Sequence, residues 1–243
     1  MATVSIIIPT LNEEKYLSST LECLMQLKPP AHEIIIIDGT SQDYTQQIAC
    51  SYPVIFKTSA KAQRSVQMNL GAEIAGGELL CFLHADTLVP LNLVERVRFT
   101  LLDEQIALGG FISLMKGNRT RWLTTSLNFI KTYLAPFLYR PDRFFFHHLR
   151  LLFGDQAMFC RQTDFFHCGG FNDNLPIMEE ADLCIKMNRV GKIKQINQTV
   201  ISSDRRLAHW GLWKAHFIWF SICALWALRV SPIWLKKFYT EIR

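Results

Sequence analysis

Short, mostly apolar runs alternate with helical patterns along the first third of the chain. The apolar runs cover residues 4–8, 34–37, 54–56 and 79–83. The segments between them favour helices over residues 12–24, about 41–50 and 64–74. Buried strands that alternate with helices are typical of a parallel sheet that is covered on both faces. The pattern therefore predicts an α/β fold with a doubly wound, mostly parallel sheet.

Polar residues follow three of these runs directly. Pro9 and Thr10 follow the first run, Asp38 follows the second, and His84 and Asp86 follow the last. The carboxyl ends of parallel strands form the crevice in which such sheets bind ligands. His84 and Asp86 share one side of an extended chain and could hold a divalent cation, unless Asp86 caps the next helix. Asp38 could accept a hydrogen bond from a ribose or a base, or cap its own turn.

Acidic residues also mark the second half of the chain. Glu179, Glu180 and Asp182 open a helix predicted over residues 179–188, where acids suit the helix dipole and a carboxylate could also act as a general base. Asp155 precedes another apolar stretch, where it could face a substrate or serve as a cap. These positions are therefore candidates for catalysis, with a purely structural role as the alternative.

Basic and aromatic residues dominate two later stretches. Residues 116–150 carry one acid, Asp142, among many lysines, arginines and aromatic residues. They predict either a lid or membrane-facing surface on the acceptor side, or a helical hairpin with a solvated basic face. The tail over residues 213–239 is apolar around most of its circumference, which predicts an interfacial attachment to a membrane rather than a span. Arg205 and Arg206, at the end of a strand predicted from about residue 193, suit either a diphosphate or surface ion pairs.

Composition narrows the class of protein. Among 243 residues, 49% are hydrophobic and 19% charged, which is typical of a globular chain. A net charge of +5 suits an anionic ligand or surface, but does not by itself indicate nucleic acid. Seven scattered cysteines predict reduced thiols in the cytoplasm, and we expect no signal peptide. The chain has neither a dinucleotide fingerprint nor a P-loop.

Motifs along nearly the whole chain carry a resemblance to a known family. They cover residues 4–13, 34–43, 64–72, 82–87, 154–157, 169–171, 178–183, 203–206 and 230–232. In this order and spacing they resemble the family 2 glycosyltransferases of the GT-A fold, and a bacterial branch of that family associated with radical-SAM proteins. The resemblance implies a single domain over residues 1–243. Its parts would be a nucleotide-sugar-binding half (1–115), an acceptor and catalytic half (116–212) and an aromatic helical tail (213–243).

The resemblance also implies roles for individual residues. The nucleotide-sugar would be held by Pro9, Thr10, Leu11, Glu13, Asp38, Arg64, Asp86, Arg205 and Arg206. Asp86 and His84 would bind Mg²⁺ or Mn²⁺, and Asp155 and Glu179 would lie on the acceptor side. Glu180 stands where the family usually has an aspartate as the base, and Asp182 is the fallback. Asp204 also departs from the family and could pair with an arginine and weaken the Arg205–Arg206 clamp.

The implied activity is inverting transfer from a nucleotide-sugar, most often a UDP-sugar, to a hydroxyl acceptor. The resemblance leaves the acceptor unidentified; the basic, aromatic stretches favour a lipid-linked one and a cytoplasmic location at the inner face of a membrane. Two alternatives stay open. A sugar nucleotidyltransferase should carry a basic, glycine-rich loop near the N-terminus, and residues 9–14 contain no lysine or arginine. A non-catalytic nucleotide-sugar-binding protein stays open because Glu180 replaces the usual base.

Overall fold

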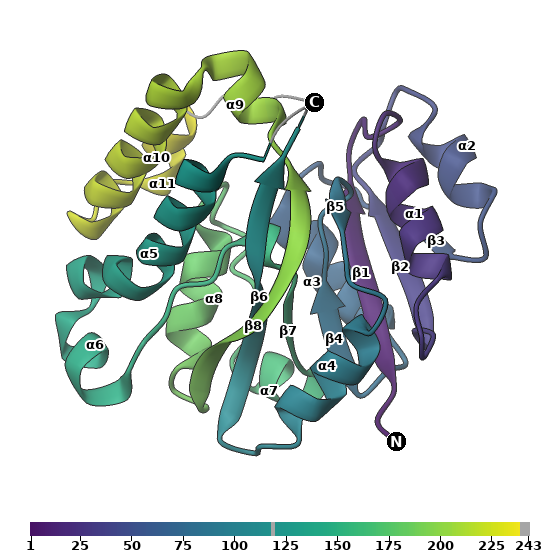
Figure 1. Cartoon of the computed structure of the whole chain (residues 1–243), viewed down its shortest axis with the longest axis horizontal. Helices are drawn as coiled ribbons and strands as arrows, with labels where there is room; N and C mark the ends of the chain where they lie inside the picture. Colours follow the sequence, from purple (N-terminus) through teal and green to yellow (C-terminus); the bar gives the residue numbers. More distant parts are fainter. Residues whose placement is uncertain (118–119, 239–243) are drawn as a thin grey trace.

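A twisted sheet organises the chain, which the computed structural model describes over residues 1–117 and 120–238 (Figure 1). Its strands are β1 (Val4–Thr10), β2 (Glu33–Asp38), β3 (Ile55–Thr58), β4 (Leu79–Phe82), β5 (Thr87–Leu88), β6 (Ile106–Lys116), β7 (Met158–Arg161) and β8 (Lys192–Ser203). The helices are α1 (Leu17–Met25), α2 (Thr45–Cys50), α3 (Arg64–Ile74), α4 (Leu93–Leu101), α5 (Trp122–Tyr139), α6 (Pro141–His147), α7 (Gln162–His167), α8 (Glu179–Met187), α9 (Arg205–Trp210), α10 (Leu212–Ala227) and α11 (Pro232–Lys236). A short 3₁₀ helix, η1, covers Gly154–Gln156.

The strand order is β3-β2-β1-β4-β7-β6-β8-β5. The first four strands in this order are parallel, as the alternating pattern predicts, and β6 is parallel to β8. Strands β7 and β5 run antiparallel to their neighbours. Because β2 and β4 flank β1 on opposite sides, the direction of chain progression reverses at β1. Ligands of α/β sheets bind at such a switch point, at the carboxyl ends of the strands.

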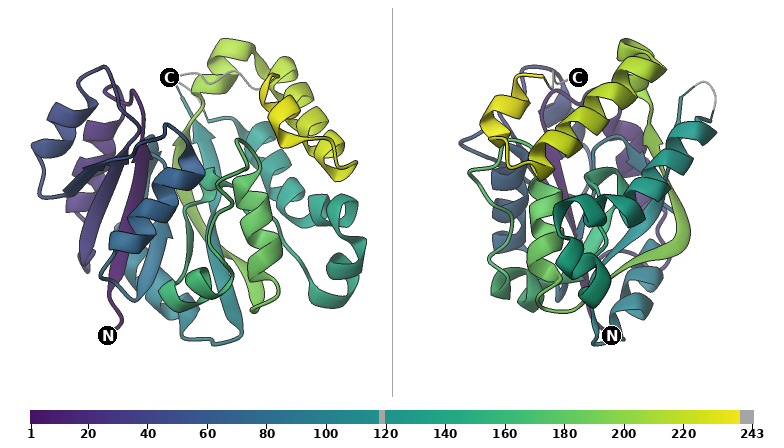
Figure 2. Two further views of the ribbon diagram at one scale, coloured as in Figure 1. Left: turned by 180° about the vertical axis from the view of Figure 1, so that it is seen from behind. Right: turned by 90° about the vertical axis from the view of Figure 1, so that its left-hand side faces the viewer.

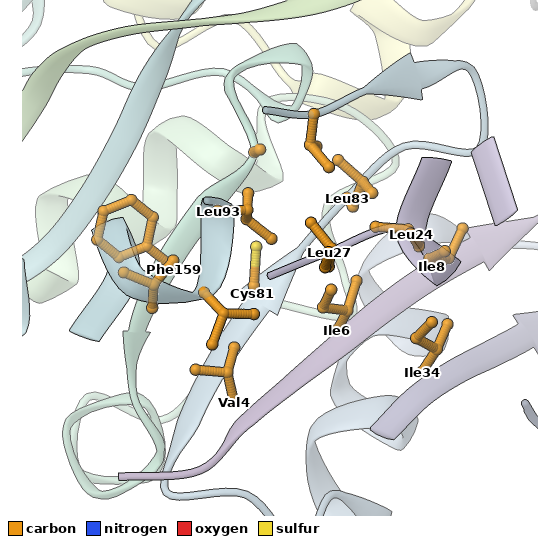
Figure 3. Packing of buried hydrophobic residues seen from close by; sticks show 14 of the residues in the cluster. Val4, Ile6, Ile8, Leu24, Leu27, Ile34, Cys81, Leu83, Leu93 and Phe159 are labelled. Carbon is orange, nitrogen blue, oxygen red and sulfur yellow. The ribbon is translucent and has the colours of Figure 1, made fainter. Parts of the chain in front are cut away.

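Alternating side chains of the central strands build a core on each face of the sheet. Ile6 and Ile8 of β1 pack in the cluster that contains residues of α1 and α4, whereas Ile7 packs in the cluster of α3 and α8. Figure 3 shows part of the first cluster, including Val4, Leu24 and Cys81. Full burial of each large apolar side chain contributes roughly 1.5–3 kcal/mol, which explains why these strands are apolar on both faces.

Two expectations from the sequence at the first strand are wrong: that Pro9 ends the strand, and that Asn12 caps the helix that follows. Pro9 does not stop β1, which continues to Thr10. Pairing with β4 ends at Ile7, so Pro9 lies beyond that ladder and its missing N–H leaves no hydrogen bond unmade there. Asn12 does not cap the first helix, because it adopts a left-handed φ of 55° and α1 begins only at Leu17. Glu13 therefore lies outside the helix, before its first residue.

The later helices gather on one side of the molecule. Helices α5, α6, α10 and α11 lie at the left of Figure 1, on the opposite side of the sheet from α1 and α2, and α5 contacts both α6 and α10 (Figures 1 and 2). The predicted helical hairpin is therefore present as α5 and α6. The predicted tail is helical in α10 and α11, and its residues 239–243 lie outside the described chain. Within the described residues, no helix has both the length and the apolar character needed to cross a bilayer.

Candidate active site

A cavity of about 350 Å³ opens between the carboxyl edge of the sheet and the later helices. Its wall on the sheet side includes Arg64 at the start of α3, His84 and Asp86 after β4, and Arg205 after β8. The remaining wall is built by the 3₁₀ helix η1, the start of α8, and residues of α5, α10 and α11. The structure therefore brings residues from both halves of the sequence into one concave site.

Arg205 links two acidic residues that the sequence places far from it. Its guanidinium donates to both carboxylate oxygens of Glu13, at 2.7 and 2.9 Å, and its Nε lies 3.1 Å from Oδ2 of Asp86. Burial raises the pKa of Glu13 above its ordinary value, although the hydrogen bonds from Arg205 act in the opposite direction. The left-handed turn at Asn12 makes this pair possible, because it turns Glu13 out of α1.

Glu179 and Glu180 enter the cavity at the start of α8. They are 4% and 9% exposed, and Arg64 Nη1 lies 3.8 Å from Glu179 and 3.6 Å from Glu180. Burial and the neighbouring charge of Glu180 raise the pKa of Glu179 to about 8. A side chain on Gly154 would come within 2.3 Å of His84 Nε2 and 2.6 Å of Glu180 Oε1. Glycine is therefore required at that position, and it lets η1 approach both residues.

Asp38 holds the turn that follows β2. It lies opposite Thr10 in the register of β1 and β2, and it is 3% exposed. Its carboxylate accepts hydrogen bonds from Thr10 Oγ1 at 2.9 Å, from Ser41 N at 2.7 Å and from Ser41 Oγ at 2.6 Å. Gln67 donates to the carbonyls of Thr10 and Ile37 and so ties the same two strand ends together. The predicted turn-capping role of Asp38 is thus present.

The other predicted residues differ in their position. Asp155 lines the cavity and accepts a hydrogen bond from Asn128 of α5 at 3.1 Å. Asp182 does not line the cavity and instead forms an ion pair of 2.9 Å with Lys186. Pro9 and Leu11 flank Thr10 and are also outside the cavity wall. The side chain of Arg206 lies outside the described part of the chain.

Tertiary structure adds cavity residues that have no signal in the sequence. Lys131 and Asn128 of α5 line it, and so do Trp219 of α10 and Lys236 of α11. In the sequence, Lys131 and Asn128 are recognisable only as members of the basic, aromatic stretch over residues 116–150. Asp204 does pair with an arginine, but its partner is Arg121 at 2.8 Å, which leaves Arg205 to Glu13 and Asp86.

The donor atoms at this edge suit a hard cation that is only partly held by protein. Within residues 1–117 and 120–238, no three His, Cys, Asp or Glu side chains gather as a metal cage. Asp86 and His84 line one cavity and offer a carboxylate oxygen and an imidazole nitrogen. Mg²⁺ usually keeps several positions for water and substrate phosphates, so two protein donors are sufficient for it. Such a cation would have to replace Arg205 as the partner of Asp86.

Fold and site together define an α/β protein with a charged cavity at the switch point of its sheet. The model of glycosyl transferase family 2 matches residues 5–165, and the chain belongs to this family of enzymes. None of the curated proteins compared with the chain matches it. The arrangement of sheet and helices is the GT-A fold.

Solved structures show the same fold at low sequence identity. TarS from S. aureus in complex with UDP-GlcNAc has a TM-score of 0.64 and 18% identity, over 84% of this chain and 59% of that one. Glucosyl-3-phosphoglycerate synthase from Mycobacterium tuberculosis, with Mn²⁺, UDP and glucosyl-3-phosphoglycerate, has a TM-score of 0.63 and 18% identity over 95% and 81%. The mannosyltransferase PcManGT from Pyrobaculum calidifontis, with GDP-Man and Mn²⁺, has a TM-score of 0.68 and 14% identity over 95% and 65%. The chain thus spans less than two thirds of the TarS chain.

Asp38 offers a first test of the nucleotide site. We expect Asp38→Ala to weaken UDP binding by roughly 1–3 kcal/mol, the range for losing a hydrogen bond to a charged group. The melting temperature should also fall, because Thr10 and Ser41 lose their acceptor. Isothermal titration with UDP separates the two effects. Unchanged UDP affinity, with only the melting temperature lowered, would restrict Asp38 to its structural role.

Glu179 predicts a pH-dependent stability. Its pKa is raised from 4.5 to about 8, so between these values the folded protein holds a proton that the unfolded chain has released. Stability is therefore lost as pH rises through this window. We expect Glu179→Gln to melt progressively higher than wild type between about pH 5 and about pH 8, by about 2–4 °C for each kcal/mol. Glu104→Gln, at an exposed glutamate, is the control. If the melting temperatures of wild type and Glu179→Gln changed with pH in the same way, the raised pKa of Glu179 would be contradicted.

Proposed function

We propose that this glycosyltransferase transfers a sugar from a nucleotide-sugar, and specifically from a UDP-sugar, to a hydroxyl acceptor. The transfer would proceed with inversion and with the help of a divalent cation. One observation carries the proposal. A single cavity contains the carboxylate of Asp86, the guanidinium groups of Arg64 and Arg205, and the carboxylate of Glu180. These are the groups that transfer from a diphosphate leaving group requires. The UDP-GlcNAc bound to TarS, and the nucleotides and Mn²⁺ bound to the synthase and to PcManGT, support it.

The proposed roles follow from the charge that each group carries. Glu180 would take the proton of the acceptor hydroxyl as its oxygen attacks the anomeric carbon. Arg64 and Arg205 would bind the diphosphate, whose charge increases as the bond to the sugar breaks. Asp86 and His84 would hold Mg²⁺ or Mn²⁺. The bound cation would supply Lewis-acid stabilisation of the leaving group.

Arg205 would exchange partners when the donor binds. In the structure its single positive charge is shared between Asp86 and Glu13, both of which are largely buried. Buried carboxylates need a nearby positive charge or a proton, so Arg205 stabilises the site before a cation is present. With a cation at Asp86, the guanidinium would be available to the diphosphate. Because Asp204 pairs with Arg121, it does not compete for Arg205.

Finer parts of the proposal rest on sequence patterns. The motifs support membership of the bacterial branch associated with radical-SAM proteins. The basic and aromatic residues of 116–150 and the tail support a lipid-linked acceptor. They also support a cytoplasmic protein in peripheral contact with the inner face of a membrane.

A screen of nucleotide-sugars by thermal shift, with and without Mn²⁺, tests the proposal directly, because a bound ligand stabilises the folded state by mass action. We expect one donor to raise the melting temperature only when Mn²⁺ is present, and the same donor to release its nucleotide on turnover. Binding without turnover would favour the non-catalytic alternative. The absence of stabilisation by any nucleotide or nucleotide-sugar would overturn the proposal.

A further inference from the structure

Helices α5, α6, α10 and α11 share an exposed apolar surface, which we call the aromatic face. Most of the exposed large apolar side chains in the described chain belong to these helices or directly follow them. Trp122, Trp213 and Trp234 are 69%, 80% and 45% exposed, and Phe217 and Phe220 are 72% and 68% exposed. Exposed apolar side chains that gather on neighbouring helices mark an interaction surface.

The charge of the aromatic face points to an anionic partner. Over residues 120–150 and 205–238, which contain all four helices, Asp142 is the only acid. Asp142 is itself neutralised by Arg140 at 2.7 Å. Lysine and arginine, by contrast, recur through both stretches, for example at Arg143, Lys214 and Lys237. Tryptophan beside lysine and arginine is the composition of surfaces that lie in the headgroup region of an anionic bilayer.

The same helices form the wall of the catalytic cavity opposite the sheet. Helix α5 contributes Lys131 to the cavity while the preceding residues Phe129 and Ile130 are 42% and 46% exposed. Helix α10 contributes Trp219 while its neighbour Phe220 is exposed on another side of the helix. The same helices thus form the wall of the cavity and the aromatic face.

Lys131, like Lys236, is a lysine of this wall that lines the cavity. Its Nζ lies 3.8 Å from the centroid of the Phe153 ring and 5.9 Å from that of Trp219. Phe153 precedes Gly154, whose backbone approaches Glu180 closely. Within the described residues, Lys131 has no carboxylate within 4.0 Å, whereas Arg64 and Arg205 each have at least one. The aromatic rings stabilise its charge and leave the ammonium able to bind an anion.

We propose that the acceptor is an anionic lipid, taken from a bilayer on which the aromatic face docks, with its charged group bound by Lys131. This inference rests on the proposed function, because it names the acceptor class for that site. The hydrocarbon part stays in the bilayer beside α5 and α10. The hydroxyl next to the anionic group would then lie within reach of Glu180. An acidic protein partner would not need exposed aromatic side chains on all four helices, whereas a bilayer contacts them all.

Vesicle sedimentation with the full chain tests the docking. We expect co-sedimentation with vesicles of phosphatidylcholine and phosphatidylglycerol, weakened by salt, and none with phosphatidylcholine alone. Phe220→Ser should weaken the binding roughly tenfold, by the free energy of burying one aromatic side chain. Phe99→Ser on α4 is the matched control, because Phe99 is also 68% exposed but lies outside the aromatic face. It should bind vesicles like wild type.

Three outcomes would overturn the docking. In the first, the protein binds UDP with Mn²⁺ in a thermal shift assay but stays in the supernatant with both kinds of vesicle. In the second, Phe99→Ser weakens vesicle binding as much as Phe220→Ser. In the third, light scattering shows a dimer that Phe220→Ser dissociates, with no vesicle binding, so the face joins two copies of the chain. Loss of UDP binding in the same preparation would instead be a failure of the proposed function.

The role of Lys131 has a separate test. Dihexanoyl phosphatidylglycerol and dihexanoyl phosphatidylcholine, below their micelle concentrations, are titrated into the protein with UDP and Mn²⁺ bound. We expect Lys131→Met to weaken binding of the anionic lipid about tenfold, the effect of losing one charge-assisted contact. Binding of the zwitterionic lipid and of UDP should not change. Lys28→Met, at an exposed lysine after α1 and outside the aromatic face, should leave all three affinities unchanged. Equal binding of the anionic lipid by wild type and Lys131→Met would exclude this role.

Discussion

Glu180→Gln is expected to lower turnover by about 10²–10⁴-fold, the usual contribution of a general base, and to leave donor affinity unchanged. Glutamine keeps the shape of the side chain and removes its basicity. Proton transfer involves only the acceptor hydroxyl, so donor binding does not depend on it. The structure strengthens the choice of this residue, because Glu180 lines the cavity close to Arg64 whereas Asp182 lies outside its wall. Single-turnover rates and a separate UDP titration measure the two quantities.

Two further variants complete this experiment. Glu180→Asp restores the residue that the family usually has, and it should keep activity or raise it if the extra methylene displaces the carboxylate. Asp182→Asn should retain turnover, because Asp182 pairs with Lys186 away from the cavity. If Glu180→Gln turns over at the wild-type rate, the base lies elsewhere. Weakened donor binding in that variant would assign Glu180 to the phosphate-binding part of the site.

Asp86→Ala is expected to reduce the Mn²⁺-dependent part of UDP binding by roughly 10–100-fold, while the fold stays intact. One of the two proposed protein donors would be lost, and losing groups around a metal typically costs that much affinity. The fold should tolerate the change because Arg205, the partner of Asp86, keeps its two hydrogen bonds to Glu13. Calorimetric titration of UDP with and without Mn²⁺ gives the metal-dependent difference.

The matched control for this variant is Asp142→Ala. Asp142 is also paired with an arginine, Arg140, but lies on α6 outside the cavity wall. It should leave UDP binding unchanged in both conditions. If Asp86→Ala binds UDP with Mn²⁺ as tightly as wild type, the metal role of Asp86 is wrong. A general loss of UDP affinity, with or without Mn²⁺, would instead indicate that the released Arg205 disturbs the donor site.

Local patterns in the sequence were sufficient for most secondary structure. The predicted helix over residues 64–74 agrees with α3. Paired glycines also favour a bend in a strand, and β6 has a register irregularity directly after Gly109 and Gly110. Apolar periodicity reports which residues are buried, and burial is what both elements depend on. The predicted start of α1 was wrong. The backbone N–H of Asn12 donates to Ser41 and its side chain accepts a hydrogen bond from Gln42, so neither group caps a helix. Those partners belong to another loop and leave no local signal.

The sequence by itself determined the α/β class, the parallel direction of the first strands, and the polar residues at their carboxyl ends. Each of these depends on patterns within short segments of the chain. Only the tertiary structure decided which charges meet. Glu13 and Arg205 are 192 positions apart, yet they form a bidentate pair. Gly154 lies against His84 and Glu180, and Lys131 lies over Phe153. Such contacts depend on how the helices pack across the sheet, and packing is a property of the whole chain that no local window of residues contains.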